Sequence, residues 1–195
     1  GEQKDLHDKI EGDASVSMIT IDSDDGLNIM RHTLTAQVLA RAIKNLYPKS
    51  QLAIGPIIED GFYYDVETDK TISIDDLQKI EDEMKNIVKT NSSITKKLVS
   101  KSDALKVFKS LKEPYKEEII SESDQKDDFQ LYYQDKEEFV DLCRGPHLPN
   151  LSFIGSFKLT KVSGAYWKGD SKNTMLTRIY GTAWKNDKDL EKYLN

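Results

Sequence analysis

The stretch QLAIGPIIEDGFYYDV, residues 51–66, decides the fold. Its two apolar segments, Gln51–Ile58 and Gly61–Val66, flank the residues Glu59-Asp60-Gly61. Asp-Gly between two apolar runs is a strong signal of a β-hairpin, whose strands run antiparallel. This stretch therefore predicts at least one antiparallel sheet.

Helical patterns lie on both sides of the hairpin. From Leu27 to Tyr47 the apolar residues recur every three or four positions, and Pro48 ends the pattern. A second helix is predicted over Ser73–Thr90. The rest of the chain predicts strands at Ile94–Val99, Lys116–Ile120, Phe129–Tyr133, Phe157–Val162, Gly164–Lys168 and Met175–Tyr180, and helices at Ser102–Leu111 and Asp187–Leu194. Because helices and hairpins mix without regular βαβ alternation, we predict an α+β fold, an antiparallel sheet with packed helices.

The start of the chain reads differently. Residues 1–25 are mostly polar, and the one strand pattern in them, Ala14–Ile21, has no neighbouring strand to pair with. The cluster Ser23-Asp24-Asp25-Gly26 is typical of a turn or boundary. We therefore predict that residues 1–25 are a linker or the tail of a preceding domain, and that residues 26–195 form the main domain.

Composition excludes several classes of protein. A formal net charge of −6 argues against a protein that slides along nucleic acid, although a local basic patch can still grip one end of such a molecule. No apolar run approaches the ~20 residues of a membrane span. A single cysteine excludes an internal disulfide and is typical of a reducing cytoplasm, so a cytoplasmic location is expected.

The most reactive residue types gather in DLCRGPH, residues 141–147. Cys143 is the only cysteine and His147 is one of three histidines. A thiol and an imidazole four residues apart can face one small volume, either on a helix or across a turn made by Gly145 and Pro146. A purely structural interpretation is a buried free thiol with a capping histidine.

A third group can join this pair. His32 lies near the start of the first predicted helix, where it is either a functional base or a polar residue on the flank of the helix. His32, Cys143 and His147 together offer three zinc ligands, with Gln37 or Asp141 as a weak fourth, and three protein ligands plus water are typical of catalytic zinc. Without a metal, the same groups can orient one attacking water.

A third stretch, residues 163–184, is dense in aromatic and small residues with single charges, including Gly164–Asp170 and Arg178–Trp184. Aromatic rings beside lysine and arginine can stack a terminal base and neutralise phosphates. Aromatic core packing around hairpins explains the same composition.

Taken together, these stretches resemble a known family. The helix that opens with Arg31-His32, the hairpin segment Ile54–Asp65, the stretch Asp141–His147 and the segments Gly164–Asp170 and Arg178–Trp184 match, in order and spacing, the amino-terminal editing domain of bacterial-type threonyl-tRNA synthetases. The resemblance extends from about Leu27 to Asn195. Residues 2–20 resemble the end of the small β-grasp domain that precedes editing in such enzymes. No part of the chain resembles an aminoacylation core or an anticodon-binding domain.

The resemblance implies hydrolytic editing of tRNA(Thr) that carries serine at its 3′ end, without any cofactor and without a metal. A second site is needed because one methyl group distinguishes threonine from serine by only ~1–3 kcal/mol. The matching residues imply roles in catalysis for His32, Lys116, Cys143 and His147, and in substrate binding for Gln37, Tyr64, Asp141 and Arg144. Lys116 is expected to stabilise developing negative charge or to hold the terminal phosphate or ribose, and its replacement by alanine is expected to change folding little.

One departure from the family pattern concerns Gln37. It stands where the family has a second helix histidine, and it follows His32 by five residues where the family has four. Five residues turn a regular α-helix through about 500°, so the two side chains would lie ~140° apart. We therefore expect a local irregularity between His32 and Gln37 that keeps the His32 ring near the Cys143–His147 turn.

Two other functions stay open from the sequence. One is a zinc-dependent alanyl-tRNA editing protein, because that group shares the His/Cys/His layout. The other is a non-catalytic module that binds the 3′ end of tRNA and has lost hydrolysis, because Gln37 can hold a water but cannot take its proton. No membrane partner is expected, and the remaining synthetase domains are absent from this chain.

Overall fold

The predicted hairpin is present in the computed structural model, which describes all of residues 1–195. Strand β3 (Gly61–Glu67) pairs antiparallel with β2 (Ile57–Ile58) and with β1 (Gln51–Leu52). The turn consists of Glu59 and Asp60, and Asp60 has a φ of 57°. The Asp-Gly pattern predicts Gly61 in the turn, but Gly61 is the first residue of the strand. Gly61 is needed there because a Cβ atom would lie 2.2 Å from the carbonyl oxygen of Gly181.

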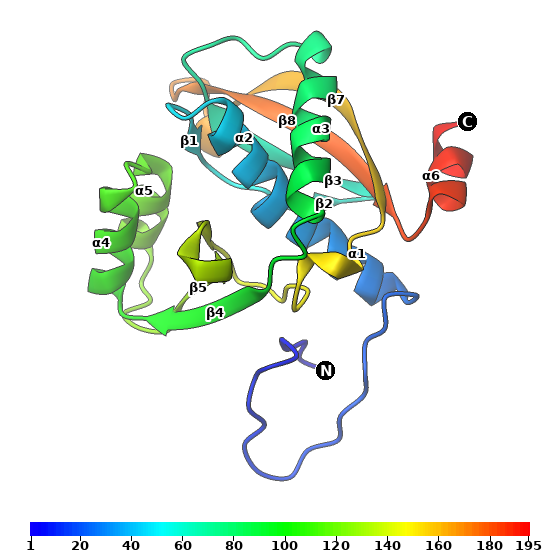
Figure 1. Cartoon of the computed structure of the whole chain (residues 1–195). Helices are drawn as coiled ribbons and strands as arrows, with labels where there is room; N and C mark the ends of the chain where they lie inside the picture. The colour runs from blue at the N-terminus through cyan, green and yellow to red at the C-terminus, as the bar shows by residue number, and fades with distance from the viewer.

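The hairpin belongs to a five-stranded antiparallel sheet of order β1-β3-β8-β7 with β2 beside β3 (Figure 1). Strand β7 (Ser156–Tyr166) and strand β8 (Met175–Trp184) form its other half. The two strands predicted at residues 157–162 and 164–168 are thus one strand, and residues 167–169 form a 3-10 turn instead. A second sheet, of order β4-β5-β6, consists of β4 (Ile94–Val99), β5 (Phe129–Gln134) and β6 (Val140–Leu142).

The predicted helix over residues 27–47 is one continuous helical rod with an irregular centre. It begins as α1 (Asp24–Thr33), widens into the π-helix η1 (Leu34–Leu39) and ends as α2 (Ala40–Leu46). Ser23 caps its first turn by accepting a hydrogen bond from the backbone of Gly26. The expected irregularity between His32 and Gln37 is therefore confirmed.

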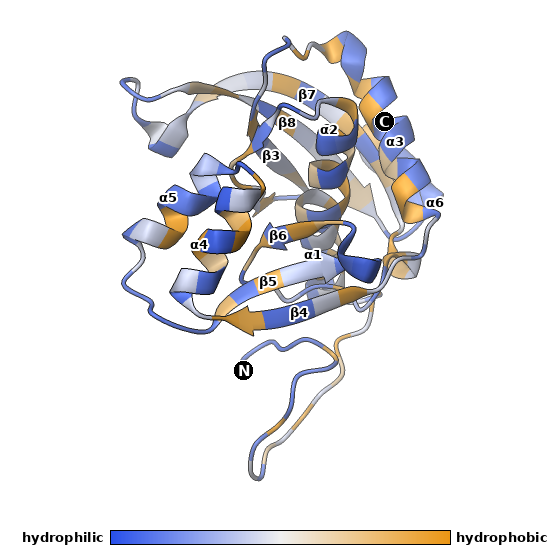
Figure 2. Cartoon of the chain, turned by 60° about the vertical axis from the view of Figure 1, so that its left-hand side comes forward, coloured by the Kyte–Doolittle hydropathy of each residue, from blue (hydrophilic) through white to orange (hydrophobic).

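Helix α3 (Leu77–Val88) and the helical rod cover one face of the large sheet together (Figures 1 and 2). It follows a short 3-10 turn, η2 (Ile74–Asp76), which a capping box between Ser73 and Asp76 opens. The main core lies between these helices and the sheet, where Leu34, Met84 and Ile179 are fully buried. Each such side chain contributes about 1.5–3 kcal/mol of transfer free energy, and the rod is thereby held rigidly against the sheet.

Two further helices hold the small sheet in place. Helix α4 (Lys101–Ser110) and helix α5 (Pro114–Glu122) lie side by side (Figure 2), and they pack together and onto β5 through a second core that includes Phe108, Ile120 and Phe129. The predicted strand Lys116–Ile120 is therefore wrong. Pro114 occupies the first helical position, and Tyr115, Lys116 and Ile120 all face inward, a spacing that fits one side of a helix.

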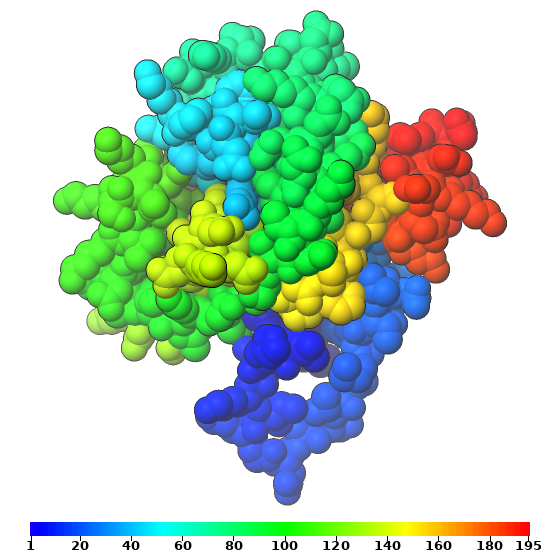
Figure 3. Space-filling model, viewed as in Figure 1, coloured from blue at the N-terminus to red at the C-terminus, as the bar shows by residue number.

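The two ends of the chain differ in structure. Residues 1–23 contain no helix and no strand, so the predicted strand at Ala14–Ile21 is wrong, because no neighbouring strand pairs with it. These residues begin below β4 and β5 and then run beneath the rest of the molecule to the start of α1 (Figures 1 and 3). Helix α6 (Asp187–Leu194) ends the chain as predicted. None of the helices has the length and apolar character needed to cross a lipid bilayer.

Candidate functional site

His32 and Cys143, which are 111 residues apart in the sequence, meet at one point of the fold. His32 is in the last turn of α1, and Cys143 follows β6 directly. The His32 Nε2 and Cys143 Sγ atoms lie 3.0 Å apart, and the backbone N–H of Gly145 donates to the same sulfur atom at 3.3 Å. The helix and the small sheet together therefore hold the thiol against the imidazole.

Burial keeps both members of this pair neutral. It raises the pKa of the Cys143 thiol to about 12, and the Asp141 carboxylate adds to this effect. Burial also lowers the pKa of His32, although the Pro146 carbonyl and the carboxylates of Asp141 and Asp5 act in the opposite direction. A protonated thiol is a hydrogen-bond donor and a poor nucleophile, so Cys143 is placed to orient His32 rather than to attack a substrate.

His147 completes the cluster. Its ring lies 4.6 Å from the His32 ring and 4.5 Å from the Tyr132 ring, both between centroids, and the Tyr132 and His147 rings are perpendicular. The Nδ1 atom is 2.9 Å from the hydroxyl oxygen of Thr33, whereas the buried Nε2 atom has no hydrogen-bond partner in the protein. Burial, with His32 nearby, holds the pKa of His147 well below its usual value. The ring is therefore neutral, and one of its nitrogens is available to a ligand.

A second buried group lies beside the cluster. The Asp141 carboxylate accepts hydrogen bonds from the Tyr64 hydroxyl (2.9 Å) and the Leu142 backbone (2.8 Å), and it pairs with the Lys116 ammonium at 2.9 Å. Helix α5 supplies Lys116, and β3 and β6 supply the other two side chains. Burial and the neighbouring Asp141 raise the pKa of Tyr64 well above its usual value. Lys116 therefore carries a buried positive charge whose position Asp141 fixes.

The first residues of the chain also reach this site. The Asp5 carboxylate accepts hydrogen bonds from the His147 backbone (2.8 Å) and the Tyr132 hydroxyl (2.7 Å), and it pairs with Lys96 at 3.1 Å. Three donors on three different segments thus converge on one anionic group beside His147. Gly145, at a φ of 63°, makes this close packing possible, because a Cβ atom there would lie 2.0 Å from the Tyr132 hydroxyl.

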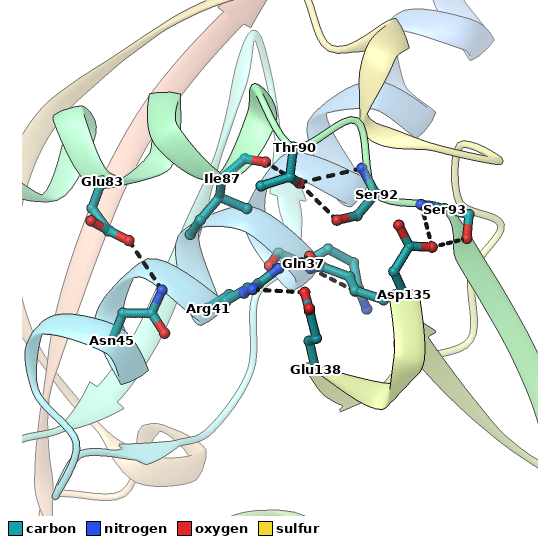
Figure 4. Close-up of polar contacts among 11 residues, drawn as sticks. Gln37, Arg41, Asn45, Glu83, Ile87, Thr90, Ser92, Ser93, Asp135 and Glu138 are labelled. Carbon is teal, nitrogen blue, oxygen red and sulfur yellow. Dashed lines mark hydrogen bonds and ion pairs between the residues drawn. The ribbon is translucent and has the colours of Figure 1, made fainter.

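Two of the predicted site residues lie apart from the cluster. Gln37 is fully buried, but its amide bonds to β5, with the Tyr132 carbonyl at 3.4 Å and the Gln134 amide at 3.1 Å. Gln134 in turn accepts a hydrogen bond from Arg41, which pairs with Glu138 (Figure 4). Arg144 is exposed at the surface next to Cys143.

The remaining six predicted residues fall into the two groups just described, His32 with Cys143 and His147, and Lys116 with Asp141 and Tyr64. Sequence reasoning missed Thr33, Tyr132 and Asp5, whose contacts depend on which segments the fold brings together. The one sequence signal for Thr33 is its place beside His32. Two surface hollows, of about 390 Å³ beside α6 and about 800 Å³ between α4 and α5, contain no residue of either group.

The arrangement suits chemistry on a polar, neutral group in a shielded site. A bare imidazole nitrogen can accept a proton from water or from a hydroxyl group, and a fixed ammonium can stabilise negative charge. The nearest ligand atoms of His32, Cys143 and His147 also lie within 4.8 Å of one another, so the same groups offer three donors to a metal. Zinc would require the thiol to lose the proton that it shares with His32.

Comparisons with known proteins identify the relatives of this chain. Residues 130–180 match the family model described as the threonyl and alanyl tRNA synthetase second additional domain. The chain is 48% identical over 191 residues to threonine–tRNA ligase of Prochlorococcus marinus (strain MIT 9211), which is 98% of this chain and 30% of that protein. It is 49% identical over 195 residues, all of this chain, to threonine–tRNA ligase 2 of Bacillus subtilis (strain 168), again 30% of that protein. The chain thus spans about 30% of the length of these relatives.

Proposed function

We propose that this chain hydrolyses the ester that links serine to tRNA(Thr), because it is 48–49% identical over almost its whole length to threonine–tRNA ligases and residues 130–180 match the threonyl and alanyl tRNA synthetase second additional domain. The observation that carries the proposal is the unpaired Nε2 atom of His147, which is buried beside His32 and Cys143. A neutral imidazole with a free lone pair can act as the general base that accepts a proton from the attacking water in ester hydrolysis.

Each step of the reaction has a residue to support it. Water attacks the carbonyl carbon of the aminoacyl ester and gives one proton to His147 Nε2. The carbonyl oxygen becomes an oxyanion, and the Lys116 ammonium stabilises it. The bond between the carbonyl carbon and the ribose oxygen then breaks, and His147 returns the proton to that oxygen. The products are free serine and tRNA with an intact 3′ end.

Selectivity follows from size. A pocket that accepts serine can exclude threonine if the extra methyl group collides with its wall, whereas a synthetic site gains only ~1–3 kcal/mol from that methyl group. We propose that the partner is the serine-charged 3′ end of tRNA(Thr), and that no metal or other cofactor takes part. Arg144 is exposed beside Cys143, and in this proposal its guanidinium contacts the phosphates of that end.

A deacylation assay tests the proposal. The protein should hydrolyse seryl-tRNA(Thr) much faster than threonyl-tRNA(Thr), and His147→Asn should lower the rate by roughly 100-fold, because asparagine can still donate to Thr33 but cannot take a proton. The matched control is His7→Asn, because His7 is exposed and lies outside the site. Circular dichroism should show that all variants keep the parent fold.

Two other outcomes would contradict the proposal. One zinc ion per chain, with hydrolysis of alanyl-tRNA that a chelator abolishes, would show a zinc-dependent alanyl-tRNA editing protein instead. Binding of tRNA without any hydrolysis would show a module that recognises the 3′ end and has lost the reaction.

A further inference from the structure

Within the function proposed above, we infer that Thr33 is a positioning residue that fixes the proton of His147 on Nδ1 and so keeps Nε2 bare for catalysis. The argument rests on how one hydroxyl group distributes its single proton. Thr33 is fully buried in α1, where no water competes for that proton.

Three groups surround the Thr33 hydroxyl oxygen. The carbonyl oxygen of Ile29 lies 2.9 Å away, the Leu148 backbone nitrogen 3.0 Å away and His147 Nδ1 2.9 Å away. The Ile29 carbonyl can only accept a hydrogen bond, and the Leu148 N–H can only donate one.

These fixed roles decide the third. Two oxygen atoms 2.9 Å apart with no proton between them would repel each other, so the Thr33 proton points to the Ile29 carbonyl. The hydroxyl then has no proton left to give to His147, and it can only accept a hydrogen bond from the ring. The His147 proton therefore lies on Nδ1, and Thr33 makes three hydrogen bonds, which is all that a hydroxyl can make.

The consequence falls on the other nitrogen of the ring. A neutral imidazole carries one proton, so Nε2 has a free lone pair, and this is the buried atom without a partner. The other groups that face the ring do not compete for Nδ1. Asp5 binds the His147 backbone, the Tyr132 hydroxyl donates to Asp5, and the His32 ring packs beside the His147 ring at 4.6 Å. Thr33 alone therefore selects the tautomer.

The tautomer can be read directly by nuclear magnetic resonance. Long-range proton–nitrogen correlation spectra of protein labelled with ¹⁵N-histidine distinguish a protonated ring nitrogen from a bare one, and this chain has only three histidines to assign. We expect a protonated Nδ1 and a bare Nε2 for His147 in the parent protein and in Thr33→Ser, which keeps the hydroxyl. In Thr33→Val, which keeps the shape but loses the hydroxyl, the Nε2-protonated form should appear.

Kinetics provide a second readout. Thr33→Val should lower kcat for seryl-tRNA by about 10- to 100-fold with little change in KM, because it removes the correct proton position and not a substrate contact. Thr33→Ser should hydrolyse at close to the parent rate. The matched control is Thr35→Val, since Thr35 is also buried in the rod but donates to the Tyr63 carbonyl outside the site.

Two results would overturn the inference: a proton on Nε2 of His147 in the parent protein, or an unchanged tautomer in folded Thr33→Val. The first needs no variant, so the test holds even if Thr33→Val fails to fold. A failure of the proposed function would give a different experimental result. If no variant hydrolyses seryl-tRNA but the tautomers behave as expected, the reaction is wrong and the role of Thr33 stands.

Discussion

Lys116 and Asp141 pair where the protein has almost no exposed surface, since the two side chains are only 4% and 2% exposed. Removing one partner of such a pair leaves the other charge buried without compensation, which costs about 3–5 kcal/mol. The sequence-based expectation that Lys116→Ala changes folding little is therefore not supported. Lys116 has a structural role in addition to any role in catalysis.

We predict that Lys116→Met lowers the free energy of unfolding by about 3–5 kcal/mol, because Asp141 loses its counter-ion. The double variant Lys116→Met with Asp141→Asn should recover much of this loss, because asparagine is uncharged and its oxygen still accepts from Tyr64. Urea unfolding of both variants and of Asp141→Asn alone measures the effect. Equal stability of the single and double variants would contradict the prediction.

At this scale the sequence predicted part of the site. His32, Cys143 and His147 were recognisable because their types are rare in the chain and their stretches match a family pattern. Lys116 and Tyr64 came from that match alone, since a lysine in a helix or a tyrosine in a strand carries no signal of its own, and Asp141 was otherwise only a weak fourth candidate ligand. Sequence patterns did not reveal Thr33 and Tyr132, because Thr33 contacts His147 across 114 residues and Tyr132 contacts Asp5 across 127 residues.

Among the elements, the π-helix has the clearest consequence. An extra residue in a regular α-helix rotates everything beyond it by about 100°. In η1 the backbone instead bonds from residue i to i+5, as the Ala40 N–H does to the Thr35 carbonyl, and this absorbs the extra residue. His32 and the buried residues of α2 thus both face inward.

We predict that deleting Leu34 converts this segment into a regular α-helix and leaves the flanking turns in place. Combined with Gln37→His, the deletion should restore a histidine four residues after His32 and raise seryl-tRNA hydrolysis above the parent rate. The checks are the deacylation rate and a structure of the double variant. The matched control is the deletion with Gln37 unchanged. A folded double variant that hydrolyses seryl-tRNA no faster than this control would contradict the prediction.

The sequence predicted helices and strands correctly wherever the local residue pattern and the packing of the fold favour the same structure. The residues of β4 and α6 were predicted as found, because alternation or helical spacing is clear in both. The segment around Lys116 was misread because its apolar residues, at Ile119 and Ile120, are β-branched and favour strands, while the helix depends on Pro114 and on packing against α4. Strand β6 is too short for periodicity to reveal it.

For the whole molecule, buried ionisable groups set the pH range of stability. Burial lowers the pKa values of His32 and His147 in the folded state, so the unfolded chain binds protons more tightly, and stability is lost as pH falls below about 6.5. Burial raises the pKa values of Cys143 and Tyr64, so stability is lost as pH rises above the unfolded value of the thiol, 9.0. Stability should be greatest between these two limits.

We predict that the free energy of unfolding falls by up to ~1.4 kcal/mol per pH unit for each histidine below about pH 6.5. His147→Asn should flatten this acid slope, whereas His7→Asn should not. Burial raises the pKa of Glu113 and opposes the loss only at lower pH, as its carboxyl group becomes protonated. Urea unfolding from pH 5 to pH 8 provides the measurement, and an equal slope in His147→Asn and the parent would contradict it.

The separation of His32 and Cys143 by 111 residues in the sequence has a consequence during synthesis on the ribosome. The helix with His32 emerges first, and at 5–20 residues per second the turn with Cys143 follows roughly 6 to 22 s later. Through that interval the imidazole has neither its thiol nor its second histidine. The cluster is therefore incomplete in a nascent chain until the residues through His147 have left the exit tunnel, and a chain truncated before Cys143 contains His32 without the thiol and the second histidine.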